Sequence, residues 1–433
     1  MQPNTNDVIF NKLTLSTLDG NRSVDLTLLM LEMNIIEDIF KGYIYGDITI
    51  TDEINLYNGL PVLCEEVLNV SFSTTVSTEV RAYKFFCYNI CNMMIDRESK
   101  YQVYTLKFIS FDQYTTSKSI NSFNVSGLIS DNIKKLLITT NVVNPVEYIQ
   151  PTTVNVNYTL PLNTVFDNIK YLKTKAYTNI KGDSNVWVFY ETSKGYTFQT
   201  ISNMITRGIK KKASLEASDI STTINIGTYS HLPLSTSKVY LRASSSSAIG
   251  SRDTLSGLRE GHYNSNMLAY DLTTRSLQNY SDNYQNSFGS FTHTDSNNLQ
   301  PYPNQSQYFQ NNVISNTPYT HFNVGDSTKP DFNINTSTFN SRNMYTQTLS
   351  EYNLTVTVPG DTHIYAGDIL NVDLPERSPY TVTLDLFKSG NYLVGSQTHN
   401  FKGTVAYNMV LVLFKDCAVG NIETQMETQS VSL

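Results

Sequence analysis

The chain has 433 residues, which is too long for one ordinary hydrophobic core, so two to four domains are expected. Only 16% of the residues are charged, below the roughly 25% of typical soluble domains, so the surface must be largely uncharged and polar. Such a surface suits permanent protein contacts, although a secreted β-protein would look the same. The net charge of -7 argues against a general nucleic-acid binder, because phosphate contacts need a basic face.

The sequence offers no pattern typical of a membrane span, a signal peptide, a disulfide or a zinc site. No apolar run approaches the ~18 residues of a membrane span, and the polar segment Met1 to Asp7 predicts no signal peptide. Cys87 and Cys91 lie in an extended run, where four residues span roughly 13 Å, beyond disulfide reach. Neither these two nor Cys64 and Cys417 have partners at the usual zinc spacing. We therefore expect buried free thiols and a reducing compartment during synthesis.

The first part of the chain has the pattern of an antiparallel β-domain. Short apolar stretches from Val24 to Phe111 are separated by glycine and Asx turns at intervals of about eight to twelve residues, as in a β-sandwich or barrel. Near its end, Tyr104, Leu106 and Phe108 alternate with other residues, which predicts one strongly apolar face. We predict one β-domain over residues 1–118.

A different pattern follows Asp112. Ser126 is predicted to cap a helix whose buried face carries Ile129, Ile133, Leu136 and Leu137. A second helix is predicted from Asn163 or Thr164, with Asp167 in a capping box and an apolar stripe of Val165, Phe166, Ile169, Leu172 and Ala176. A hairpin over 186–198 then leads into an apolar segment at 201–205. Together these elements predict an α+β middle domain over 119–225.

The C-terminal part again alternates with the period of a strand. Apolar residues recur at every second position over 352–358 and 370–374, and Pro359-Gly360-Asp361 supplies a turn. The stretch 407–414 is apolar on nearly both faces, so we expect a strand covered on each side. We predict a second β-domain from residues 226–260 and 345–415. Residues 416–433 form a tail.

Between these two parts lies a segment rich in Ser, Asn and Tyr, over 261–344. It has few aliphatic residues, which lowers the expectation of a packed core. We expect an insertion of irregular structure, held by its aromatic residues and its neighbours.

The order and spacing of several short segments resemble the central baseplate hub protein of T-even-like contractile-tailed bacteriophages, a relative of the hub part of type VI secretion spike proteins. One departure is Cys64, which stands where the family more often has glycine. The segments that carry the resemblance are Ile36-Glu37-Asp38, Gly46 to Asp52, Leu60-Pro61, Glu65-Glu66, Tyr101 to Phe111, Phe189 to Phe198, Gly261 to Ser265, Met267 to Leu272, Val358 to Asp361, Ala366-Gly367-Asp368, Ser389 to Val394 and Lys415-Asp416.

This resemblance implies that the two β-domains are of the tail-tube type. It also implies a structural virion protein of the tail baseplate, assembled in the host cytoplasm as a homotrimer that adapts a sixfold tail tube to a threefold spike. The implied partners are the trimeric tail spike protein, the tail tube protein, baseplate wedge proteins and the tape measure protein. DNA would meet the chain only in transit through a central channel.

Several residues are candidates for a chemical site. Asp361 and His363 are expected in a solvent-facing turn rather than in an acid–base pair. Glu65 and Glu66 are adjacent, so on a strand they point to opposite faces and make a poor pair for glycoside hydrolysis. Trp187 and the tyrosines are expected in the core or an interface rather than stacked on sugars.

The one basic cluster, Arg207 with Lys210, Lys211 and Lys212, is expected in a solvated loop, with contact to DNA or an acidic partner as the alternative. Nucleophile-elbow and Walker-type motifs are absent from the sequence. We therefore predict no catalytic, cofactor-binding or metal-binding residues, no cofactor and no enzymatic activity.

Three classes of function remain open. The resemblance favours the structural hub. A carbohydrate- or receptor-binding β-rich tail-tip protein is compatible with the tyrosine-rich, weakly charged surface. A glycan hydrolase is the third possibility, and the sequence offers no suitable acid pair for it.

Overall fold

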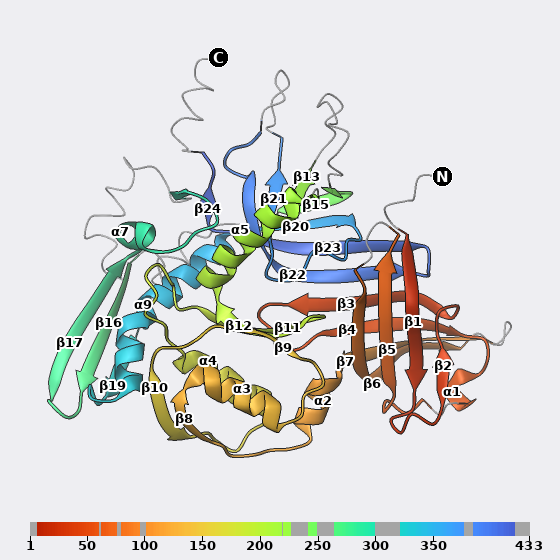
Figure 1. Ribbon diagram of the computed structural model, residues 1–433, viewed down its shortest axis with the longest axis horizontal. Helices are drawn as coiled ribbons and strands as arrows, with labels where there is room; N and C mark the ends of the chain where they lie inside the picture. The colour runs from red at the N-terminus through yellow and green to blue at the C-terminus, as the bar shows by residue number, and fades with distance from the viewer. Residues whose placement is uncertain are drawn as a thin grey trace, which may run out of the picture.

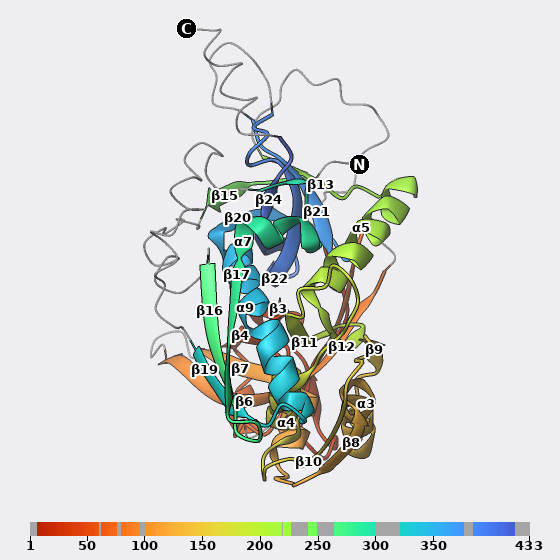
Figure 2. The ribbon, with the colours of Figure 1, turned by 90° about the vertical axis from the view of Figure 1, so that its left-hand side faces the viewer.

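The computed structural model describes residues 7–59, 62–75, 79–95, 101–218, 220–226, 241–248, 264–298, 321–375 and 384–420. The chain is mainly β with a few helices, which confirms the predicted fold class (Figures 1 and 2). Within these ranges no helix combines the length and apolar character needed to span a bilayer. Several predicted features lie wholly or partly outside them, namely Leu60-Pro61, residues 227–240 and 249–263, and residues 421–433 of the predicted tail 416–433.

A 14-stranded sheet dominates the fold, and its first half comes from the N-terminal residues. This half consists of seven strands, which we call the first β-module. Their order in the sheet is β3-β4-β7-β6-β5-β1-β2. Short helices α1 (Leu56–Gly59) and α2 (Phe111–Ser117) accompany them. The strands are β1 (Val8–Ser16), β2 (Ser23–Asp25), β3 (Met30–Asp38), β4 (Tyr45–Asp52), β5 (Val67–Thr74), β6 (Arg81–Ile95) and β7 (Gln102–Ser110).

The second half of the sheet, the second β-module, also has seven strands, in the order β14-β13-β21-β22-β23-β20-β15. When the seven strands of each module are numbered in chain order, both modules have the same order in the sheet, 2-1-5-6-7-4-3. In the first module this order is β2-β1-β5-β6-β7-β4-β3. The edge differs, because β13 runs parallel to β21 whereas β1 is antiparallel to β5. The strands are β13 (Thr223–Asn225), β14 (Leu241–Arg242), β15 (Ser245–Ala248), β20 (Tyr352–Pro359), β21 (Ile369–Asp373), β22 (Gly390–Lys402) and β23 (Ala406–Lys415).

The two modules share a local irregularity as well as an order. In the first, the register of β6 against β7 shifts between Cys87 and Asn89. In the second, the register of β22 against β23 shifts between Val394 and Ser396. A β-bulge of this kind bends a strand and increases its twist, so β6 and β22 are deformed at the same point of the same topology.

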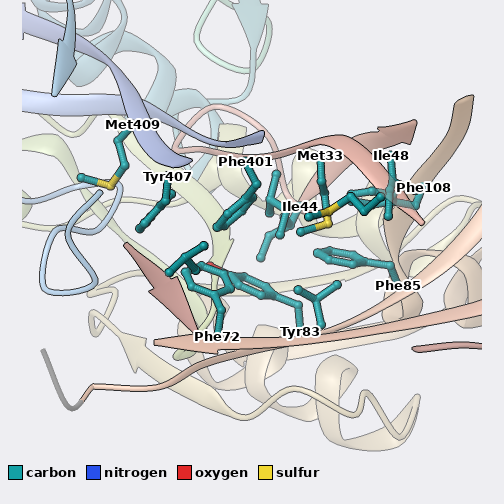
Figure 3. Packing of buried hydrophobic residues seen from close by; sticks show 14 of the residues in the cluster. Met33, Ile44, Ile48, Phe72, Tyr83, Phe85, Phe108, Phe401, Tyr407 and Met409 are labelled. Atoms are coloured by element: carbon teal, nitrogen blue, oxygen red, sulfur yellow. The ribbon is translucent and has the colours of Figure 1, made fainter. Parts of the chain in front are cut away.

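Strands β22 and β3 join the modules edge to edge. They pair antiparallel from Ser396 opposite Asp38 to Lys402 opposite Glu32, and Figure 1 shows β23, β22, β3 and β4 stacked in that order. The alternating apolar residues of both modules enter one common core, in which Phe401 and Tyr407 lie close to Phe72 (Figure 3). The junction is therefore continuous in both hydrogen bonding and packing.

The middle domain lies beside this sheet. Helix α3 (Ile129–Thr139) begins two residues later than a Ser126 cap would place it. Ser126 is instead part of a strand, because residues 124–128 pair with 155–159. The remaining elements are β8 (Asn124–Leu128), β9 (Val146–Ile149), β10 (Asn155–Thr159), α4 (Val165–Lys175), β11 (Trp187–Thr192), β12 (Gly195–Thr200) and α5 (Ile201–Ala217).

Other predicted elements of the middle domain are present, although residues 223–225 form β13 of the second β-module. Thr164 caps α4 by accepting a hydrogen bond from the Asp167 N–H, and the predicted apolar stripes of α3 and α4 are buried. Strands β11 and β12 form the predicted hairpin.

The Ser/Asn/Tyr-rich insertion is more regular than its composition predicts. Beside the 22-residue α9 (Pro330–Glu351) stands a three-stranded sheet of β16 (Asn264–Asp271), β17 (Ser276–Asn283) and β19 (His321–Gly325). Helix α9 crosses the predicted boundary at 344. Its buried Thr338 and Thr348 hydroxyls donate to carbonyls four residues earlier, which lets polar residues pack inside. Smaller elements are α7 (Tyr284–Ser287), η1 (Phe288–Ser290), β18 (Asn297–Asn298) and β24 (Cys417–Ala418).

Strand β23 departs from its expected environment. Tyr407, Met409, Leu411 and Leu413 are buried, but Val410, Val412 and Phe414 on the other face are only half-buried. The strand is thus covered fully on one face, and partly on the other, rather than equally on both.

Candidate functional site

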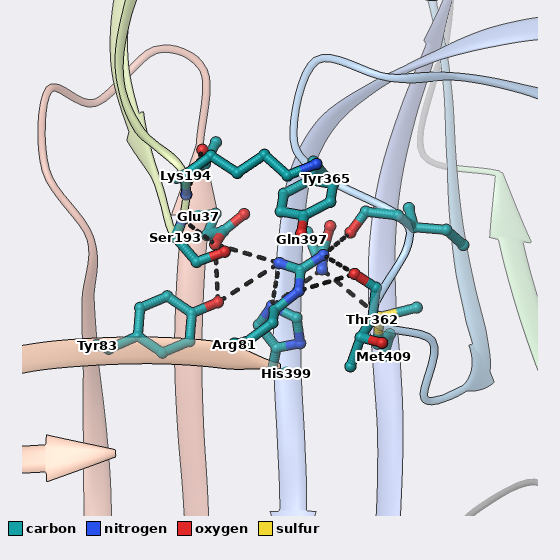
Figure 4. Close-up of polar contacts among 12 residues, drawn as sticks. Glu37, Arg81, Tyr83, Ser193, Lys194, Thr362, Tyr365, Gln397, His399 and Met409 are labelled. Carbon is teal, nitrogen blue, oxygen red and sulfur yellow. Dashed lines mark hydrogen bonds and ion pairs between the residues drawn. The ribbon is translucent and has the colours of Figure 1, made fainter. Parts of the chain in front are cut away.

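Arg81 marks the point where both β-modules and the middle domain meet. Its side chain is completely buried and lies 3.4 Å from the Glu37 carboxylate, which is buried to the same extent (Figure 4). Its Nε and Nη2 donate to the carbonyl of Thr362 at 3.1 and 2.9 Å, and Nη2 also donates to that of Ile364. Arg81 and Glu37 belong to the first module and the two carbonyls to the second. A charged hydrogen-bond network therefore crosses the junction.

His399 completes this network from β22. Its Nε2 lies 3.4 Å from Arg81 Nη1 and 2.9 Å from Gln397 Nε2, both of which donate. Nε2 must therefore accept, so the proton sits on Nδ1 and is donated to the Tyr407 hydroxyl at 2.6 Å. Burial, and then the nearby Arg81 charge, hold the pKa of His399 well below its usual value. The ring is neutral and acts as an acceptor for the arginine.

The middle domain reaches the same junction through the turn between β11 and β12. The Ser193 N–H donates to Glu37 at 3.2 Å, and the Lys194 ammonium lies 3.9 Å from the centre of the Tyr365 ring. The Arg81 guanidinium lies 3.7 Å from the same ring centre. Two cations from different elements thus contact one aromatic ring of the second module.

A second contact between the first module and the middle domain involves Glu191. It is fully buried, accepts from the Ile44 N–H at 3.2 Å and accepts from the Asn144 amide. Nearby, Asp112 accepts from the N–H groups of residues 143 and 144. Burial, with the Asp112 carboxylate adding to it, raises the pKa of Glu191 to about 8. The carboxyl group is therefore protonated in the folded chain at neutral pH.

The basic cluster lies on helix α5 rather than in a loop, because residues 201–217 pack one apolar face on β21 and β12. Arg207 stacks on Tyr148 and Lys211 pairs with Asp368. Lys210 is exposed, as expected of a solvated residue. Arg207, Lys211 and Lys194 line a cleft of about 170 Å³ between the middle domain and residues 365–368. Each of these cations already has a partner, so the cluster serves mainly to dock α5.

Of the remaining sequence candidates, only Asp361 and His363 are brought together, with 3.0 Å between Oδ1 and Nδ1. His363 is half-buried, not fully solvent-facing, and contacts Asp361 and Glu79. Glu66 is buried and accepts from the N–H groups of Leu63 and Glu65, so its carboxylate fixes a turn. Trp187 is buried and stacks on Phe198 in the middle-domain core. The four cysteines are free.

One group of potential ligand atoms was not predicted, at His293, Asp416 and Cys417. These atoms lie within 4.8 Å of one another in a buried position. The two ring nitrogens of His293 face Asp416 and the Phe288 carbonyl, each at 2.8 Å, and both Asp416 oxygens accept hydrogen bonds. Because the donor atoms are used in this way, the group ties the insertion to the end of β23.

Sequence reasoning missed Arg81 and His399. A signal was present, because Arg81 is in phase with Tyr83 and Phe85 on the buried face of β6. A charge at an apolar position of an alternating strand indicates a paired or functional residue.

Comparison with solved structures finds similar folds, among them two with TM-scores above 0.5. They are a tail protein from Neisseria meningitidis MC58, at 12% identity and a TM-score of 0.51, and the 43 kDa tail protein of prophage MuSo2 from Shewanella oneidensis, at 8% and 0.53. Each alignment covers 94% of this chain, and 96% and 98% of the other. The chain has the fold of these tail proteins. No protein-family model and no curated protein sequence matches it. The similarity of fold thus extends over nearly the whole chain, although the sequences share little identity.

Proposed function

We propose that the chain is the central hub of a contractile phage tail baseplate, in which three copies adapt a sixfold tail tube to a threefold spike. The observation that carries this proposal is the repeated seven-strand pairing order, since each chain offers two copies of one module. Three chains then offer six modules, which matches a tube of six subunits per ring while keeping the threefold symmetry of a spike.

The junction between the modules supports this role. Six modules can form a regular ring only if the two in each chain are held at a fixed angle. The β22–β3 pairing, the shared core and the buried Arg81–Glu37 pair hold them so. A flexible linker between the modules would not fix that angle.

The proposed partners are a second and third copy of the chain, a trimeric spike protein, tail tube protein, baseplate wedge proteins and, in the channel, tape measure protein and DNA. The location is the phage virion, with assembly in the host cytoplasm. The proposed role is structural, without enzymatic activity. In support, the Glu65–Glu66 pair is built as a turn, with the Glu66 carboxylate used on backbone N–H groups.

Mass photometry tests the proposal. We expect the purified chain, alone or with its spike protein, to give particles containing three copies of 48.9 kDa. Particles that remain at one copy in both samples contradict it. A glycan array tests the alternative of a carbohydrate- or receptor-binding tip protein, and a turbidity assay on cell walls tests for glycan hydrolysis; we expect neither to give a signal above buffer.

A further inference from the structure

Among the described residues, the second half of strand β6 has one edge without a strand partner. The first half of β6 pairs with β5, from Arg81 opposite Phe72 to Phe86 opposite Val67. From Asn89 to Ile95 it pairs with β7 on one edge, and no strand among the described residues pairs with the other edge. In β22, the strand at the same place in the second module, this half of the strand is the part that pairs with β3.

Strand β15 has the complementary open edge. It occupies in the second module the place of β3 in the first, since β15 pairs with β20 as β3 pairs with β4. Its other edge has no strand partner within the described residues, and Ser245, Ser246 and Ser247 are exposed. The chain therefore carries one filled junction of the β22–β3 kind and the two halves of a second one.

We propose that the second half of β6 in one copy of the chain pairs antiparallel with β15 of a second copy, repeating the internal junction between subunits. This inference rests on the proposed hub for the number of copies. The contact is heterologous, so it must close into a ring or continue as a filament. If the angle between neighbouring modules is the same at this contact as at the internal junction, all six modules of the ring are related by equal rotations.

The internal junction also gives the register. There Asn400 is opposite Asn34, and Phe401 is opposite Met33. Strand β6 has a second register shift between Cys91 and Met94, which β22 lacks, so equivalent positions are assigned through the partner strands and not by counting along β6. Through their partners on β23 and β7, Asn400 corresponds to Met94; through β20 and β4, Asn34 corresponds to Ser247. We therefore expect Met94 of one copy to lie opposite Ser247 of the next.

The surface of β6 fits a partner better than it fits solvent. Tyr88, Met93 and Met94 expose 47%, 40% and 71% of their surface. Neither residues 88–95 nor β15 carries a charge or a proline, which are the usual protections of a solvent-exposed strand edge. Pairing the two edges would cover exposed apolar groups without taking any charge out of water.

Cysteine cross-linking tests the register. The double variant Met94→Cys/Ser247→Cys is made in a chain with Cys64→Ser and Cys91→Ser, and it is mildly oxidised. Opposite residues of an antiparallel pair have Cβ atoms about 4.5–5.5 Å apart, near disulfide range. We expect cross-linked dimers and trimers on a non-reducing gel. The matched control Leu162→Cys/Ser247→Cys, with an equally exposed cysteine in the middle domain, should give none.

A second variant, Met94→Lys, places a charge at a site that is open in the single chain, so we expect normal folding and at least tenfold weaker assembly. Trimers that form without the 94–247 cross-link, or that tolerate Met94→Lys unchanged, contradict this pairing and leave the hub proposal standing. Specific 94–247 cross-links in a particle that is not a trimer support the pairing and contradict the trimeric hub.

Discussion

Arg81 and Glu37 form a fully buried pair in which each side chain contacts the other. Burial raises the pKa of Glu37 above its usual value, and the Arg81 charge opposes that rise. Removing one partner of such a pair leaves an uncompensated buried charge, which typically costs about 3–5 kcal/mol. We expect Arg81→Met to lower the free energy of unfolding by about that amount in urea titrations. The double variant Arg81→Met/Glu37→Gln should recover part of the loss, because no buried charge then remains. A double variant no more stable than Arg81→Met would contradict this role for the pair.

Glu191 gives the junction with the middle domain a pH dependence. Its pKa of about 8 in the folded chain is above that of an ordinary glutamate, so the folded state holds the proton more tightly. Its contribution to stability is therefore fully present at acidic pH and is lost as the pH rises from about 4.5 to 8. We expect the melting temperature to fall more steeply across pH 5–8.5 in the wild type than in Glu191→Gln.

The control for this experiment is Glu53→Gln, which changes an exposed carboxylate in the first module. It should keep the wild-type pH profile. A Glu191→Gln profile parallel to that of the wild type would show that the carboxyl does not take up a proton on folding.

Cys64 illustrates what a resemblance can predict at the scale of one residue. The family more often has glycine at this position, and the backbone of Cys64 has φ of +67°, in the left-handed region that glycine adopts most easily. A glycine, which the resemblance implies at this position, would adopt this conformation without strain. The resemblance did not predict the role of Arg81. Its role depends on two carbonyls 281 and 283 residues away in the chain, which no local pattern encodes.

Among the elements, β22 is the one on which the module junction depends, and its bulge position is sensitive to side-chain size. A Cβ atom at Gly395 would lie 1.8 Å from the Phe414 ring, which must then move out of its place beside Phe40. We expect Gly395→Ala to destabilise the chain by about 1–3 kcal/mol. Gly59→Ala, where no atom lies within 4 Å, is the matched control and should change stability by less than ~1 kcal/mol. Equal melting temperatures for the two variants would contradict this account.

The elements differ in how far the sequence could predict them. Strand alternation at 352–358 and the capped helix at 165–175 follow from local periodicity, and both are present. Helix α9 was missed because its buried positions are occupied by threonine and asparagine as well as apolar residues. Asn340, for example, is held inside by the Ser265 carbonyl, 75 residues earlier. Such partners are set by the tertiary fold, so composition alone suggested irregular structure.

At the scale of the whole molecule, the resemblance predicted two β-modules, but periodicity alone could not show that they share a pairing order. Equivalent positions carry unlike residues, as Tyr88 and Gly395 at the shared bulge show. The two modules therefore repeat a pattern of strand pairing and not an amino-acid sequence. The candidate site was predictable only in part for the same reason. The cations of α5 were visible as a cluster, whereas their docking on residues 365–368 was not.

In the proposed hub, three chains place six equivalent modules around one channel. Single-particle electron microscopy of the purified assembly tests this arrangement most directly, because averaged views along the symmetry axis resolve both the channel and the repeat. The account predicts a closed ring of three copies, with an inner layer of near-sixfold symmetry and the middle domains and insertions outside it. A monomer, an open filament, or a closed ring whose two β-modules face different directions would contradict it.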